Sequence, residues 1–95
     1  MAHGTIRMTP EEVQSAARLF KSKSEEGRNT INQLTNTWGR VKQGWEGKTA
    51  NDVDQKMNEW KKNMQEYVTV LAHIGQRLDE LAKEFHEFDN KTRAL

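Results

Sequence analysis

The sequence contains no cysteine, a single proline among its 95 residues and no long run of apolar residues. The lack of cysteine excludes both a disulfide framework and a thiolate metal site. No segment approaches the ~20 apolar residues that a membrane-spanning helix needs, and residues 1–8 lack the apolar stretch of a secretory signal peptide. If the protein is exported, we therefore expect a route that does not use a signal peptide.

The composition also has little that is typical of a sheet protein. Charged residues make up 31% of the chain and hydrophobic residues 34%, while aromatic residues account for 7%. This balance is closer to that of coiled-coil bundles than to that of β-rich proteins. The sequence therefore predicts an all-α fold, and a chain of this size is expected to gain stability from a partner.

Net charge is small as well. Fifteen basic side chains face fourteen acidic ones, which leaves +1 and gives little net attraction to nucleic acid or to an anionic membrane. Five lysines gather in the middle of the chain but are interrupted by acidic residues, so we interpret them as a solvated mixed-charge face, the alternative being a site for an acidic or phosphate-bearing partner. They are Lys42, Lys48, Lys56, Lys61 and Lys62.

Apolar residues recur in alternating steps of three and four along two long segments, which is the heptad pattern of packed helices. The pattern runs from Val13 to Trp45 on the first segment and from Ala50 to Phe88 on the second. The side chains that we expect to pack in the core or in a dimer interface are Phe20, Ile31, Leu34, Trp38, Trp60, Met64, Val68, Leu71, Ile74 and Leu78.

Local signals place the first helix. Thr9 and Glu12 have the spacing of a capping box, and Pro10 suits the first helical position, where no backbone N–H is needed. Glycine just past a helix commonly forms a left-handed cap, so Gly44 is expected to end this helix. The first helix is therefore predicted over residues 10–43.

The second helix is predicted to follow a turn over residues 44–48. Lys48 or Thr49 is expected at its cap, and it should run over about residues 49–89, leaving flexible ends. The whole chain, 1–95, is expected to form one helical-hairpin domain. A connection this short makes the two helices antiparallel neighbours, which places Phe20 near Leu71 and Ile74.

Two small residues stand in the first heptad pattern where a larger one is usual, at Ser24 and Gly27. Either a bulky side chain from the facing helix fills the space, or the small residues allow the backbone of a partner to come close. The tryptophans are expected to lie in the turn half of the hairpin, where Trp45 would close the core. Gly47 is expected to adopt a backbone geometry at the turn that other residues resist.

A second stripe of apolar residues runs beside the pattern of the second helix. On the first helix, Leu19 also lies beside the heptad pattern. An apolar stripe widened in this way suggests a second buried surface. We therefore expect two hairpins to associate side by side as a four-helix bundle. The added residues on the second helix are Val68, Val70, Ala72 and Ala82, with Gly75 between them.

Residues that could carry chemistry are present but poorly placed for it. The histidines, His3, His73 and His86, have no second ligand at a zinc-site spacing. Carboxylates at Glu11/Glu12, Glu25/Glu26 and Asp79/Glu80 are sequence neighbours whose side chains diverge on a helix, and a slender hairpin offers no pocket to hold a substrate. We expect no catalytic residue, no metal site, no cofactor and no nucleic-acid partner.

The segment between the helices has the sequence Trp45-Glu46-Gly47. A chain of about 100 residues with two heptad-patterned helices, a Trp-X-Gly turn in mid-chain and no cysteine resembles the WXG100 (ESAT-6-like) family, over about residues 6–89. The opening Ile-Arg-Met-Thr-Pro-Glu-Glu also looks like the start of many bacterial members.

The resemblance implies a small non-enzymatic protein, made in the cytoplasm and secreted without a signal peptide by a type VII (ESX) system as a folded homodimer or heterodimer. In that family a Tyr-X-X-X-Asp/Glu pattern on the second helix and the Trp-X-Gly turn of a partner form a two-part export signal, which the membrane ATPase of the system recognises. The matching residues here are Phe85 and Asp89, with phenylalanine in place of tyrosine.

Several alternatives stay open. Without the resemblance, Phe85 and Asp89 would be a core residue of the last turn and a surface carboxylate. The Phe-X-X-X-Asp form is also similar to that of small helical targeting partners of LXG-type toxins, which favours a heteromeric partner or chaperone role. The alternative from another class is a coiled-coil adaptor that stays in the cytoplasm.

Overall fold

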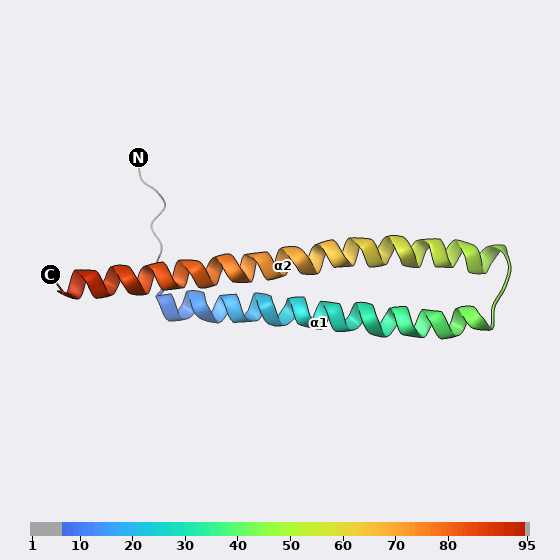
Figure 1. Cartoon of the computed structure of the whole chain (residues 1–95), viewed down its shortest axis with the longest axis horizontal. Coiled ribbons are helices and arrows are strands. Elements are labelled where there is room, and N and C mark those ends of the chain that lie inside the picture. Colours follow the sequence, from blue (N-terminus) through green and yellow to red (C-terminus); the bar gives the residue numbers. More distant parts are fainter. Residues whose placement is uncertain (1–6, 95) are drawn as a thin grey trace, which may run out of the picture.

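The chain forms two long antiparallel helices joined by a short turn (Figure 1). The computed structural model describes residues 7–94, and their side chains as far as residue 87. Helix α1 spans Pro10–Gln43 and helix α2 spans Lys48–Ala94. The two lie side by side, and α2 continues past the start of α1 (Figure 1). The predicted all-α two-helix hairpin is confirmed.

The first helix begins at the predicted capping box. The Glu12 backbone N–H donates to the Thr9 hydroxyl over 3.1 Å, and the Thr9 N–H donates to the Glu12 carboxylate over 3.0 Å. Pro10 follows the cap directly, so it removes no helical hydrogen bond. Two of the N–H groups that a helix start leaves without a partner are thereby satisfied.

The turn differs from the expected one at Gly44 and matches the expectation at Gly47. Gly44 caps α1 with φ −100° and ψ 8°, so the predicted left-handed cap there is wrong; its N–H donates instead to Val41 O over 3.1 Å. The left-handed conformation belongs to Gly47, with φ +114°. The Gly47 carbonyl accepts the Asn51 N–H over 3.1 Å, so Gly47 takes the cap position of α2 that was expected at Lys48 or Thr49.

The second helix is longer than predicted. Its backbone continues past Asp89, the predicted end, to Ala94. Over the part of the chain that the structure describes, neither helix holds a stretch that is both long and apolar enough to cross a membrane.

Small residues bring the two helices together at the middle of the hairpin. Ser24 of α1 is buried there, and Val13, Ala17 and Ile31 are buried elsewhere along the same helix. The buried Ser24 hydroxyl donates to the backbone carbonyl of Val68 over 2.7 Å. A hydroxyl on one helix can reach a main-chain oxygen on the other only where the helices run close. Val68 of the facing helix fills the space beside Gly27, as the first interpretation of the small residues predicts. Close approach of a partner's backbone stays a prediction.

Three buried positions of α2 are displaced by one residue from the predicted heptad row. The predicted pattern from Ala50 to Phe88 passes through Tyr67, Ile74 and Leu81, but the buried positions are their neighbours Val68, Gly75 and Ala82, whereas Ala50 itself is buried. A shift of one residue rotates a helix by about 100°. Val68, Gly75 and Ala82, expected on a second surface, therefore face α1, and Tyr67 and Ile74 lie on the outside.

Candidate functional site

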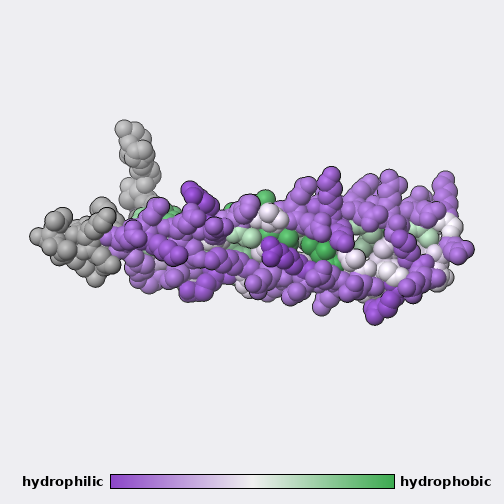
Figure 2. Space-filling view, viewed as in Figure 1, coloured by the Kyte–Doolittle hydropathy of each residue, from purple (hydrophilic) through white to green (hydrophobic). Residues whose placement is uncertain are grey.

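One flank of the hairpin carries large apolar side chains that the fold leaves uncovered. Tyr67 is 58% exposed, Leu19 57%, Leu34 45% and Ile74 37%, whereas large apolar residues on a single small chain are usually better covered. Figure 2 shows hydrophobic residues along the groove between the helices, bordered by hydrophilic ones. We define the apolar flank as Leu19, Phe20, Leu34, Tyr67, Leu71 and Ile74.

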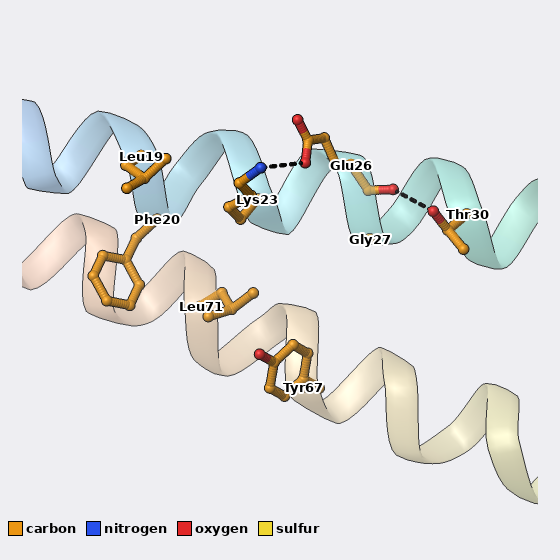
Figure 3. Close-up of a pocket in the computed structure, with 8 residues that line it drawn as sticks. All are labelled: Leu19, Phe20, Lys23, Glu26, Gly27, Thr30, Tyr67 and Leu71. Carbon is orange, nitrogen blue, oxygen red and sulfur yellow. Dashed lines mark hydrogen bonds and ion pairs between the residues drawn. The ribbon is translucent and has the colours of Figure 1, made fainter.

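A groove of about 400 Å³ opens at the centre of the apolar flank. It is far larger than the ~30 Å³ that one water molecule occupies. Phe20 extends from α1 toward α2 and lies alongside Leu71, as the predicted register required, and Tyr67 lies one turn before Leu71 on α2 (Figure 3). Gly27 forms part of the groove wall, while Lys23 and Glu26 pair over 3.0 Å at its edge. The groove has the size and polarity to take side chains from another helix.

The turn end carries a second aromatic cluster. The rings of Trp38 and Trp45 meet edge to face, with centroids 6.1 Å apart and an interplanar angle of 82°. Trp45 packs on Trp38 but remains 39% exposed, so the expectation that it closes the core is only partly met. Further along, Val53, Met57 and Trp60 line a shallow apolar groove on the first turns of α2.

Asp54 links the two helices just beyond the turn. Its Oδ1 accepts the indole N–H of Trp38 over 2.8 Å and lies 3.0 Å from Lys42 Nζ. The Trp38 hydrogen bond, followed by the hydrogen bond and charge of Lys42, holds the pKa of Asp54 below its usual 3.8. The carboxylate is therefore charged at neutral pH and binds two donors from one face of α1.

This arrangement was missed in the sequence, where Asp54 counted only as one of the acidic residues between the lysines. A signal was available. Trp38 and Lys42 are four residues apart and so share a face of α1, and the antiparallel register places Asp54 opposite them.

A second carboxylate links the helices in the other half of the hairpin. Lys21 of α1 binds Asp79 of α2, and this hydrogen bond is the main cause that lowers the pKa of Asp79. Its sequence neighbour Glu80 instead pairs with Arg77 on its own helix over 2.9 Å. Asp79 and Glu80 thus have different partners, as expected of adjacent helical side chains that do not share a proton.

The candidate export-signal residues lie on α2 near the open end. Phe85 is half-buried, and the side chain of Asp89 lies outside the described residues. Next to Phe85, His86 Nε2 is 3.8 Å from a carboxylate oxygen of Glu11, and both side chains are well exposed. Among residues 7–87, no three histidine, aspartate or glutamate side chains gather as a metal site.

The structure is therefore a small all-α hairpin with an apolar outer flank and a tryptophan-bearing turn. The model of the family described as proteins of 100 residues with WXG matches residues 5–90. The chain belongs to the WXG100 family.

Relatives and solved structures agree with this family. An ESAT-6-like protein of Streptococcus agalactiae is 27% identical over 84 residues, which are 88% of each chain. The type VII secretion system extracellular protein A of Staphylococcus aureus is 23% identical over 86 residues, 90% of this chain and 89% of that protein.

Among solved structures, the secreted protein EsxB of Bacillus anthracis matches with a TM-score of 0.81 and 29% identity, over 92% of this chain and 99% of that one. EsxA of Geobacillus thermodenitrificans shares the fold, with a TM-score of 0.86 over 96% of this chain and 99% of that one.

Proposed function

We propose that the protein is a small non-catalytic protein that a type VII secretion system exports as a folded pair of hairpins, acting outside the cell or as the export partner of another protein. Membership of the WXG100 family supports this, together with the similarity to a type VII secretion system extracellular protein and to a secreted EsxB. The family resemblance supplies the route, which needs no signal peptide.

The apolar flank is the observation that carries the pairing. A single hairpin has no third helix to cover Leu19, Leu34, Tyr67 and Ile74, and contact with water at these side chains is costly. A second hairpin laid against the flank would cover them and produce the four-helix bundle. The partner that we favour is another copy of this chain, and a related WXG100 or LXG-type chain is the alternative.

The turn and the end of α2 are the two parts that the secretion ATPase would recognise. Trp45, Glu46 and Gly47 form a corner with an exposed indole, and Phe85 with Asp89 lies at the opposite end of the long axis. In an antiparallel pair of hairpins, the turn of one copy would lie near the α2 end of the other. The two parts of the signal would then come from different copies.

Export is the experiment that tests this function. The protein is expressed in a bacterium with a type VII system, with and without the secretion ATPase, and supernatant and cell fractions are compared. The expected result is protein in the supernatant only when the ATPase is present, with a cytoplasmic marker absent from that fraction. Retention in the cytoplasm of both strains would contradict the proposal and favour an intracellular coiled-coil adaptor.

The mass of the particle in solution tests the pairing separately. Light scattering of the purified chain should give twice the monomer mass of 11.0 kDa. If the chain is monomeric alone but forms a 1:1 complex when co-expressed with a neighbouring gene product, the self-paired form is wrong and the heteromeric one is supported.

A further inference from the structure

The Trp45-Glu46-Gly47 corner has few supports of its own. Space around Gly47 is open, since a Cβ placed there would meet no atom within 4 Å. Glu46 and Lys48 are exposed. A corner with so few neighbours has to be held in place by the residues on which Trp45 rests.

Trp45 rests on two residues of the last turns of α1. Its ring packs edge to face on Trp38, with centroids 6.1 Å apart. Its backbone N–H donates to the carbonyl of Lys42 over 3.3 Å. The position of Trp45 therefore depends on where the Trp38 ring and the Lys42 backbone are held.

Both of those residues are bound by the same atom of the other helix. Asp54 Oδ1 accepts from Trp38 Nε1 over 2.8 Å and is 3.0 Å from Lys42 Nζ. The indole N–H fixes the ring plane of Trp38, because a planar donor must point at its acceptor. One carboxylate thus connects α2 to the ring on which Trp45 packs and to the side chain of Lys42, the residue whose backbone carbonyl accepts from Trp45.

We propose that Asp54 is the positioning residue of the turn: by holding Trp38 and Lys42 it fixes the exposed Trp45 indole in the orientation that a partner recognises. The recognition step rests on the proposed function, in which the secretion machinery contacts this corner. Asp54 itself touches no partner and acts through Trp38 and Lys42.

Asp79 provides a matched control. It also joins the two helices through a lysine, Lys21, and is partly exposed like Asp54: the side chains are 27% and 28% exposed. Its described partner contacts no residue of the turn. Asp54→Ala and Asp79→Ala therefore each remove one interhelical carboxylate link, and only the first removes a support of the corner.

The first measurement reports on Trp45 in the full-length protein. Fluorotryptophan gives one ¹⁹F resonance for each of the three tryptophans, which are assigned with Trp38→Phe, Trp45→Phe and Trp60→Phe. Asp54→Ala should shift and broaden the Trp45 resonance and leave that of Trp60 in place. It should also give several-fold faster amide exchange at residues 45–48, because the corner opens more often.

Two conservative changes separate positioning from general stability. Asp54→Asn keeps an oxygen for the Trp38 N–H and loses the charge that binds Lys42, so it should restore most of the Trp45 signal. Trp38→Phe keeps a ring and loses the donor, so it should move the Trp45 resonance in the same direction as Asp54→Ala. If Asp54→Ala loses its helical circular dichroism signal, the Trp45 resonances of Asp54→Asn and Trp38→Phe test the positioning role in its place. A Trp45 resonance unchanged in Asp54→Ala, or displaced equally in Asp79→Ala, overturns the proposal.

The second measurement is export. Asp54→Ala should reach the supernatant several-fold less than the wild type, with Asp79→Ala close to the wild type and cytoplasmic levels equal. If Asp54→Ala moves the Trp45 resonance but is exported normally, the role in recognition is wrong. If the wild type itself is not exported in an ATPase-dependent way, the proposed function fails, and the positioning role is decided by the resonance data alone.

Discussion

Val68 occupies the space that Gly27 leaves open: a Cβ built on Gly27 would lie 2.4 Å from Val68 Cγ1, far inside van der Waals contact. The glycine is therefore required by its neighbour on α2 and not by its own backbone conformation. Val68 is β-branched, so its side chain has little freedom to rotate away.

Gly27→Ala should destabilise the hairpin. Overpacking of a tight contact costs about 1–3 kcal/mol, while the better helix propensity of alanine returns up to about 1 kcal/mol. The net loss should be about 1 kcal/mol, or roughly 4–8 °C in Tm for a chain of this size. Thermal unfolding followed by circular dichroism measures it.

Gly39→Ala is the matched control, because a Cβ there meets no atom within 4 Å. It should stabilise the protein by roughly 0.5–1 kcal/mol through helix propensity alone. Adding Val68→Ala to Gly27→Ala should cancel the clash, so the two substitutions should be strongly non-additive. Equal effects of Gly27→Ala and Gly39→Ala would show that the close contact is unimportant.

Gly47→Ala should also be destabilising, but for a conformational reason. Its φ of +114° is a region that side-chain-bearing residues rarely adopt, although there is room for the methyl group. The strain should cost about 1–3 kcal/mol. Urea unfolding of both variants measures this cost, and Gly44→Ala, at φ −100°, should leave the free energy of unfolding nearly unchanged. A stable Gly47→Ala with unchanged amide exchange in the turn would mean that the chain reverses without this conformation.

Charges placed on the apolar flank should prevent pairing. The double variant Leu19→Glu with Tyr67→Glu puts two carboxylates in the interface that would exclude water in the four-helix bundle. An unpaired charge is costly to bury. Light scattering should then give the mass of one chain. Asn32→Glu with Thr69→Glu adds the same charge beside the groove on the opposite side of Val68, and should remain paired. Dissociation of both double variants, or of neither, would argue against the flank as the interface.

Acid should weaken the hairpin through the two interhelical carboxylates. The pKa values of Asp54 and Asp79 are lowered in the folded state from the usual 3.8. A lowered pKa means that the stabilisation is present above the unfolded value and is lost as the pH falls through the folded value. Urea unfolding should therefore show stability falling below about pH 4, less steeply in Asp54→Asn with Asp79→Asn. An unchanged slope in that variant would assign the acid sensitivity to other groups.

Phe85→Ala and Asp89→Ala should each reduce export while leaving helicity and particle mass intact, if these residues form the second half of the signal. Phe85→Tyr restores the hydroxyl of the family pattern and should be exported at least as well as the wild type. Normal secretion of both alanine variants would remove this pair from the signal.

The sequence was sufficient for the architecture but not for the rotation of α2. Heptad spacing, the Thr9 capping box and the glycine-rich turn predict two antiparallel helices in nearly the right register. The pattern also predicted Tyr67 on the inner row, because hydropathy ranks it with its apolar neighbours. Residue size decided instead: Ser24 and Gly27 admit Val68, and the larger ring is displaced outward.

The turn shows a similar limit. The sequence predicted the unusual backbone geometry of Gly47 but also a left-handed cap at Gly44. Only Gly47 carries the positive φ, because this depends on which carbonyl each N–H reaches. The interaction of Asp54 with Trp38 and Lys42 was not predicted, because both partners lie on the other helix. A carboxylate among lysines has many possible partners until the register of the two helices is known.

The small residues at the contact between α1 and α2 have a thermodynamic consequence. Val68 reaches Gly27 and Gly75 lies against Ala17 and Lys21, so few large side chains are buried within one chain. In the proposed pair of hairpins, most of the hydrophobic stabilisation available to Leu19, Tyr67 and Ile74 would arise only when two chains meet. Unfolding would then be a bimolecular equilibrium, and by mass action the Tm should rise with protein concentration. A stability of such a pair quoted without a concentration would be incomplete.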